Sequence, residues 1–307
     1  MKKARIKVKQ KIGAFGIIAF AVITIYCITI LSVLIWAFMN SFKAQFDFLG
    51  LGGLLEPNYF GFPRGPFSEK YGGWHFENYL TAFKSVSIRV GVEMFTLDEM
   101  FLNSVLYTSC MSVFGVLTPL IVAYCCAKYE FKLKGIIYTT AIIVMMIPIV
   151  GSLSSELLIQ RQLHLENLIG VCIIKNKYTG LYFLVFYGTY KSISTTYMEA
   201  ARIDGAGEFT IFFRIMLTLG KSTIFSIMIL LFINHWNDYY TPMMFLPFMP
   251  TVARGLQYVT SAPIAQLSSH IPVKLCASIM VALPTLVLFL TFRKQIMGSI
   301  AIGGIKG

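Results

Sequence analysis

Charged residues are scarce in this sequence. Only 13% of its 307 residues are Asp, Glu, Lys or Arg, whereas 56% are hydrophobic and 15% are aromatic. A water-soluble domain usually carries about 25% charged residues, and the mean hydropathy of this chain is +0.71. The composition therefore excludes an ordinary soluble protein and predicts an integral membrane protein.

Side chains that bind metals or form disulfides are also few. The four histidines are scattered without the spacing of metal ligands, so we expect no metal site; they are His75, His164, His235 and His270. The six cysteines lie in or beside apolar runs, where Cys is typical of helix packing rather than of disulfides. Paired carboxylates and a nucleophile elbow are missing from the sequence, which argues against a membrane enzyme.

The chain lacks a nucleotide-binding signature. Gly220-Lys221-Ser222-Thr223 looks like the end of a phosphate-binding loop, but Ile215 stands where that loop requires glycine. The predicted membrane boundary at this point also leaves no preceding strand. We therefore expect no ATP hydrolysis and no cofactor in this chain.

Basic residues are abundant only in places. The net charge is +12, and six of the 26 basic residues fall in the first eleven positions, directly before an apolar run. This arrangement is typical of a cytoplasmic segment (1–14) facing anionic lipid headgroups, and it does not indicate nucleic-acid binding. The apolar run from Gly13 to Met39 is too long for a signal-peptide core, so we interpret it as a retained span.

Long apolar runs are plentiful. About 20 apolar residues cross ~30 Å of hydrocarbon, and the sequence predicts five clear spans and one weak one, at about 15–39, 101–127, 135–155, 178–193, 222–241 and 274–292. The weak one is 178–193, because Lys175, Asn176 and Lys177 interrupt the apolar stretch that begins at Leu168.

Lysine and arginine predict the orientation. Sixteen of the 26 lie in the basic N-terminus, the second-to-third connection, the stretch 197–218 with its flanking Lys191 and Lys221, and the tail with Arg293 and Lys294. This distribution places all four in the cytoplasm. We expect an all-α integral membrane protein with six transmembrane helices, both ends inside, forming a single domain over 15–294. Residues 41–100 form an extracytoplasmic loop of irregular or short helical structure, and 295–307 form a cytoplasmic tail.

The stretch Tyr197–Thr218 is polar and glycine-punctuated between very apolar neighbours. Thr196 and Glu199 have the spacing of a capping box, and Asp204-Gly205 ends the helix that they begin. A second helix is expected from about Gly207 to Ile215. Since energy must come from a partner, this cytoplasmic insert is the best-placed surface to receive it.

Ionisable residues inside the spans are rare, and Asp238 is the main example. It lies in the sequence HWNDYY near the outer end of the fifth span. Two interpretations stay open: a carboxylate facing a bundle interior or a water-filled path, or a solvated carboxylate in an interfacial aromatic belt. The sparsity of such groups argues against a self-powered secondary transporter.

The insert resembles a known family. EAARIDGAGEFTIFFRIML is similar to the EAA loop in permeases of binding-protein-dependent ABC importers. Further short motifs resemble the carbohydrate-importing, maltose-permease-like subgroup: SFK (41–43), ENY (77–79), FLNS (101–104), WND (236–238) and GGIKG (303–307). The resemblance covers nearly the whole chain.

The resemblance implies partners and site residues. The partners are a second, homologous permease subunit, a cytoplasmic ATPase dimer that binds ATP and Mg²⁺, and an extracytoplasmic solute-binding protein, all at a prokaryotic inner or plasma membrane. The implied ATPase-coupling residues are Glu199, Ala200, Ala201, Asp204, Gly205, Phe209 and Phe213. The tail residues Gly303, Gly304 and Lys306 would reach the ATPases as an extended peptide, and the solute path or outer gate would include Trp236, Asn237, Asp238, Tyr239 and Tyr240.

One departure from the family concerns the end of the insert. Leu217-Thr218 stands where the family has leucine-proline, so we expect a smooth continuation into the fifth span. The cargo indicated is an oligosaccharide. A non-sugar solute is the first alternative, since the EAA loop is shared across cargo classes, and an ion-coupled transporter or channel is the second.

Overall fold

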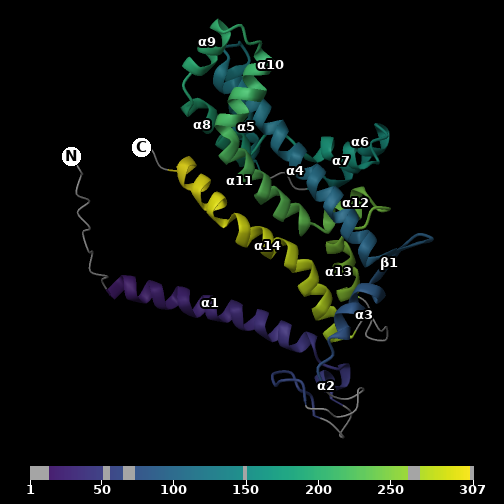
Figure 1. Cartoon of the computed structure of the whole chain (residues 1–307). Helices are drawn as coiled ribbons and strands as arrows, with labels where there is room; N and C mark the ends of the chain where they lie inside the picture. The colour runs from purple at the N-terminus through teal and green to yellow at the C-terminus, as the bar shows by residue number, and fades with distance from the viewer. Residues whose placement is uncertain (1–13, 51–55, 65–72, 148–150, 262–269, 305–307) are drawn as a thin grey trace. The chain divides into compact units, whose positions relative to one another are not determined.

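The computed structural model describes residues 14–50, 56–64, 73–147, 151–261 and 270–304 (Figure 1). Its structure is mostly helical. Among the described residues, four helical stretches are long and apolar enough to cross a membrane: Phe15–Ser41, Leu97–Lys128, Glu208–Trp236 and Ile271–Gln295. They correspond to the predicted first, second, fifth and sixth spans, so the mostly helical membrane protein expected from the sequence is confirmed.

The elements are numbered in chain order (Figure 1). They are α1 (Ala14–Ser41), α2 (Gln45–Leu49), α3 (Glu77–Ser85), β1 (Ser87–Val90), β2 (Glu93–Thr96), α4 (Leu97–Lys128), α5 (Lys134–Met146), α6 (Leu153–Gln162), α7 (Leu168–Lys175), α8 (Leu181–Ser192), α9 (Thr196–Ile203), α10 (Glu208–Thr210), the π-helix η1 (Ile211–Met216), α11 (Leu217–Trp236), α12 (Tyr240–Phe245), α13 (Val252–Ser261) and α14 (Ile271–Gly304).

The predicted third and fourth spans are present as shorter helices. The longest of the four pieces, α5, has 13 residues, or ~20 Å at 1.5 Å per residue, which is less than a ~30 Å hydrocarbon core. Gly151 and Gly180, with φ of 83° and 120°, precede α6 and α8. Such angles do not occur inside a right-handed helix. A continuous helix over 135–155 was therefore a wrong prediction.

The chain divides into two compact units, residues 1–82 with 269–279 and residues 83–268 with 280–307. In the first unit, two of the short sequence motifs meet. The Asn78 amide donates to the carbonyl oxygens of Ser41 (2.8 Å) and Lys43 (2.9 Å), and the hydroxyls of Ser41 and Tyr79 lie 2.9 Å apart. These contacts hold the end of α1 against the start of α3.

Buried polar groups organise the described part of the loop after α1. The Lys43 ammonium donates to the Asn58 carbonyl, and the Asp47 carboxylate accepts from the Asn58 amide at 3.2 Å and lies 3.7 Å from Arg64 Nε. Burial lowers the pKa of Lys43, an effect that Asp47 opposes and Arg64 reinforces. The described part of this loop is therefore irregular and short-helical structure that is packed through polar contacts.

The second unit is built around α4. This helix contacts α7, α8, α11 and α13. Its N-terminus carries a capping box, in which the Thr96 and Glu99 side chains each bond the other residue's backbone. The FLNS motif holds the start of α13 there, because Asn103 donates to the Pro250 carbonyl (3.2 Å) and the Val252 amide donates to Ser104 Oγ (2.7 Å).

A small hairpin precedes α4. Strands β1 and β2 pair antiparallel with Ser87 opposite Thr96 and Val90 opposite Glu93. Gly91, at φ 62°, lies in the turn between them. The all-α prediction did not include this hairpin, because strands of four residues carry little periodicity.

Candidate functional site

The insert 197–218 contains a helix, a turn and a second helix. The first helix, α9, ends at Ile203, and Gly205 follows at φ 81°. The Ala206 amide donates to the Ala201 carbonyl at 2.9 Å, which closes the turn. The helix–turn–helix expected around Asp204-Gly205 is therefore present.

The predicted capping box is wrong. The N-cap of α9 is Thr195, one residue earlier than expected, and its side chain makes no capping hydrogen bond. The Thr196 hydroxyl instead lies 2.8 Å from the Ser194 hydroxyl. The Glu199 side chain is exposed on the surface of α9.

The second helix of the insert continues without a break into the membrane. Residues from Glu208 to Trp236 form one helical stretch, of which Ile211–Met216 are π-helical. The Thr218 hydroxyl donates to the Arg214 carbonyl at 2.8 Å. The smooth continuation expected from Thr218 is confirmed, and short π-helical turns frequently mark functional sites.

A polar bridge joins the two helices of the insert. The Glu208 carboxylate accepts from Arg202 Nε at 2.8 Å and from the Tyr129 hydroxyl, which itself lies 3.1 Å from the Tyr124 hydroxyl. The bridge ties α9 and α10 to the end of α4. Sequence reasoning missed it, although opposite charges on either side of a glycine turn were a usable signal.

The insert is anchored by one face and exposed on the other. Met198 and Ala201 are buried in a core cluster that also contains Tyr124, Tyr190 and Ile211. Ala201 therefore packs against this chain rather than facing a partner. The remaining predicted coupling residues are exposed: Glu199, Ala200, Asp204, Gly205, Phe209 and Phe213.

Large apolar side chains stand out on the exposed face. Ile203 and Phe209 are 86% and 83% exposed, and Phe213 is 59% exposed. Two cavities flank them. One of about 560 Å³ is lined by Thr196, Tyr197, Ala200, Asp204 and Ile215, and one of about 430 Å³ by Ile121, Tyr124, Phe209, Phe212 and Phe213. Clustered apolar exposure of this kind is typical of a protein-binding surface.

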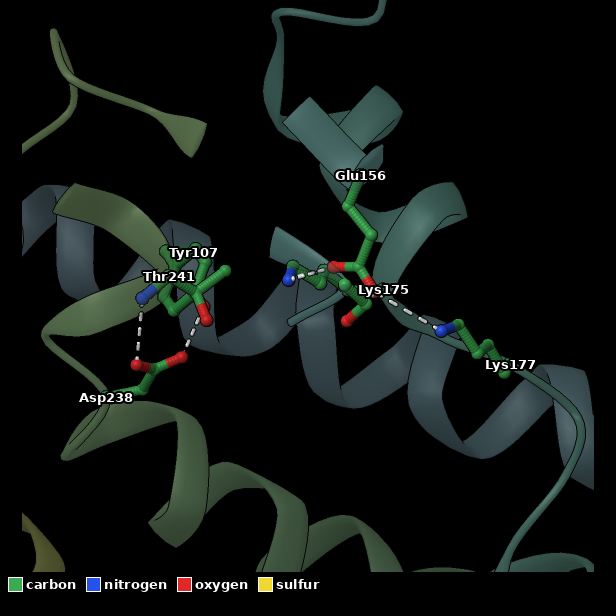
Figure 2. A network of polar contacts seen from close by, with 7 residues as sticks. Tyr107, Glu156, Lys175, Lys177, Asp238 and Thr241 are labelled. Atoms are coloured by element: carbon green, nitrogen blue, oxygen red, sulfur yellow. Dashed lines mark hydrogen bonds and ion pairs between the residues drawn. The ribbon is translucent and has the colours of Figure 1, made fainter. Parts of the chain in front are cut away.

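The HWNDYY stretch lies at the other end of α11. Figure 2 shows the Asp238 carboxylate facing Tyr107 and Thr241. Its carboxylate accepts from the Tyr107 hydroxyl at 3.1 Å and from the backbone amides of Tyr240 and Thr241, each at 3.0 Å. Asp238 is half-buried and caps α12, so neither sequence interpretation foresaw its structural bonds.

The neighbours of Asp238 divide into anchors and exposed residues. Trp236 is buried, and its Nε1 donates to the Val281 carbonyl on α14 at 3.0 Å. Asn237 is exposed and donates to the Ile233 carbonyl at 2.8 Å. Tyr239 and Tyr240 are 43% and 45% exposed. Among the predicted pathway residues, the rings of Tyr239 and Tyr240 are therefore the ones that present exposed aromatic surface.

The C-terminal tail differs from the expected extended peptide. Its backbone is helical through Gly303 and Gly304, as the end of α14. Residues 296–302 contain three isoleucines, a methionine and an alanine, which continue the helix more readily than a run of glycines would. Lys306 lies outside the described residues.

Comparisons with known proteins agree with this architecture. A family model described as "Binding-protein-dependent transport system inner membrane component" matches residues 115–293. The arabinooligosaccharides transport system permease protein AraQ of Bacillus subtilis is 28% identical over 243 residues, covering 76% of this chain and 79% of the relative. The diacetylchitobiose uptake system permease protein NgcG of Streptomyces coelicolor is 24% identical over 296 residues, covering 94% of this chain and 88% of the relative.

A solved structure shares the fold. It is the crystal structure of a bacterial ABC transporter involved in the import of the acidic polysaccharide alginate, and the likeness has a TM-score of 0.68 at 20% identity, covering 91% of this chain and 95% of that one. The family match spans more than half of the chain. The chain therefore belongs to the inner-membrane components of binding-protein-dependent transport systems: it is a multi-pass permease of the bacterial inner membrane and the non-catalytic part of an ABC importer.

Proposed function

We propose that this permease translocates an oligosaccharide that an extracytoplasmic binding protein delivers, and that it works beside a second, homologous permease subunit. The observation that carries the cargo is the nature of its relatives: AraQ and NgcG are named for the transport of arabinooligosaccharides and of diacetylchitobiose. The exposed rings of Tyr239 and Tyr240 supply surfaces on which sugars stack.

The proposed topology has six spans with both termini in the cytoplasm. Two of the six are interrupted: α5 with α6 forms the third, and α7 with α8 forms the fourth. Breaks at membrane depth are compatible with a bilayer where they are buried in protein or line a water-filled path. This favours a solute pathway along the broken spans.

The insert 197–218 is the proposed coupling element. Phe209 and Phe213 offer apolar surface to a cleft of the ATPase, and Glu199 and Asp204 offer negative charge to basic groups there. Since α10, η1 and α11 are continuous, movement of the docked insert is passed along one helix to Trp236. That residue holds α14 through its bond to Val281.

A long apolar groove suits the second permease subunit. A cavity of about 620 Å³ opens between α4 and α11 and is lined mostly by apolar side chains, among them Val113, Leu117, Leu217, Phe225 and Met228. The apolar residues of α1 are exposed almost throughout as well. A homologous helix or lipid would cover both surfaces in the membrane.

Purification and transport test the proposal. The tagged chain, gently solubilised, should bring down an ATPase and a second permease, and the complex in vesicles with its binding protein should import an oligosaccharide when ATP is present. Glu199→Lys should leave the chain in the membrane but detach the ATPase or uncouple hydrolysis from uptake. Lys132→Glu, an exposed charge change on another cytoplasmic connection, is the matched control. Normal sugar uptake with Glu199→Lys would contradict the coupling assignment.

A further inference from the structure

The break between α7 and α8 packs against the middle of α4. The Asn176 amide nitrogen lies 3.7 Å from Met111 Sδ, and a Cβ added at Gly115 would lie 2.8 Å from Asn176 Oδ1. At ~1.5 Å per residue, Met111 and Gly115 are each at least ~20 Å from both ends of α4. If α4 crosses the bilayer, the break lies near its centre.

Three charged side chains gather at this break. Lys175 Nζ lies 2.6 Å from Glu156 Oε2, and Lys177 Nζ lies 3.3 Å from Glu156 Oε1. Figure 2 shows the carboxylate between the two lysines. Lys175 also lies 3.9 Å from the centre of the Phe245 ring, which adds a cation–π contact. Two ammonium groups share one carboxylate, so the cluster carries a net positive charge.

The two lysines are in different situations. The side chains of Glu156 and Lys175 are 16% and 23% exposed, whereas that of Lys177 is 57% exposed. The short Glu156–Lys175 pair already joins α6 to α7 with balanced charge. A structural tie between these helices therefore does not need Lys177.

The exposed ammonium of Lys177 cannot face lipid at this depth. A charge near the bilayer centre costs at least about 2.5–3.5 kcal/mol, so such groups point to the bundle interior or to a water-filled path. The non-helical backbone of residues 176–180 must likewise be buried in protein or line a water-filled path at this depth. Both features place a positively charged, wetted surface along the solute pathway.

We propose that Lys175, Lys177 and Glu156 form a cationic station in this pathway, which receives an anionic group of the transported sugar, a carboxylate or a sulfate. The proposal rests on the proposed function as an oligosaccharide permease and names its substrate class. The longer Lys177–Glu156 contact is the one that a passing anion exchanges. Glu156 retains Lys175 through the shorter charge-assisted bond.

The test uses the complete importer, with its ATPases, second permease and binding protein, in vesicles. Uptake is measured for three probes of similar length: tetragalacturonate, a sulfated galactose tetrasaccharide and maltotetraose. The variants are Lys177→Gln, Lys177→Arg and Glu156→Gln. Lys132→Gln removes an exposed lysine outside the pathway and serves as the control.

We expect the wild-type importer to take up at least one anionic probe, and the probe taken up identifies the anion. Lys177→Gln should lower the uptake of that probe relative to maltotetraose about tenfold, the effect of losing one charged hydrogen bond. Lys177→Arg should keep the wild-type ratio. Glu156→Gln should keep or raise the ratio, since it adds to the positive charge, whereas a purely structural pair predicts equal losses for all probes.

Other outcomes overturn the inference. If wild type imports maltotetraose but neither anionic probe, the cationic station is refuted and the proposed function stands. If Lys177→Gln and Lys177→Arg have the same ratio, charge recognition is refuted. If the importer takes up no sugar at all, the proposed function itself fails.

Discussion

Replacing Gly205 by alanine tests the turn inside the insert. Gly205 lies between α9 and α10 at φ 81°, and a Cβ added there would meet no atom within 4 Å. The change therefore perturbs backbone conformation alone, without a steric clash. The turn determines how the exposed side chains of α9 are presented beside Phe209.

The magnitude follows from two opposing terms. A non-glycine residue in the left-handed region costs about 1–2 kcal/mol. Replacing glycine by alanine also restricts the unfolded chain, which returns roughly 0.4–1 kcal/mol of global stability. The second term does not act on docking, because the chain is folded whether or not the ATPase is bound. In the undocked Gly205→Ala variant the turn relaxes out of the left-handed conformation, and docking to the ATPase must restore it. Docking therefore costs the additional ~1–2 kcal/mol, which raises the dissociation constant for the ATPase about fivefold or more.

The assay is ATPase binding to the purified permease pair, followed by sugar uptake in vesicles. Gly205→Asn should retain wild-type affinity, because asparagine tolerates the left-handed region better than other residues. Gly207→Ala is the matched control: Gly207 has an extended backbone with φ −72° and ψ 160°, and it too has no atom within 4 Å of an added Cβ. Equal affinities for Gly205→Ala and Gly207→Ala would refute the reasoning.

Two further predictions concern stability. Gly170→Ala would place a Cβ 2.4 Å from the Leu165 carbonyl oxygen, so thermal unfolding in detergent should show that the protein loses roughly 1–3 kcal/mol of stability. Gly188→Ala, in α8 with open space around it, should stabilise the protein by about 0.5–1 kcal/mol. A Gly170→Ala variant more stable than Gly188→Ala would contradict this packing. Burial lowers the pKa of Lys43 from 10.5. Between the lowered pKa and 10.5 the unfolded chain therefore binds more protons than the folded protein, and the free energy of unfolding should rise with pH through that window. Lys43→Met should remove this rise. If the free energy of unfolding of wild type and of the variant changed with pH in parallel, the prediction would be contradicted.

Much of the membrane architecture could be predicted from the sequence. Runs of apolar residues are a sufficient signal for α1, α4, α11 and α14, because a bilayer requires length and apolarity above all. The insert was recognisable for the opposite reason. Its glutamate, aspartate and glycines are out of place between such runs, and Asp204-Gly205 marks the turn where it occurs.

The broken spans could not be predicted, because apolar composition does not report backbone conformation. Gly180 takes φ 120°, an angle that no local pattern near Lys175–Lys177 specifies. The sequence was interpreted there only as a weak span. The Tyr107–Asp238 bond joins residues 131 positions apart. Contacts at that separation depend on the packing of α4 against α11, which residue spacing cannot give.

The π-helical residues Ile211–Met216 also set an angle. An α-helix advances ~100° per residue, and a π-turn accommodates one extra residue within the same continuous rod. The angle about the helix axis between Phe209 and Trp236 therefore depends on the π-helical winding of Ile211–Met216. Winding the same residues as a regular α-helix, with none removed, would rotate Phe209 by up to about 100° about the helix axis relative to Trp236. The two ends of this rod are thus kept in phase by a local irregularity, so the coupling role that we propose for the insert would include rotation as well as translation.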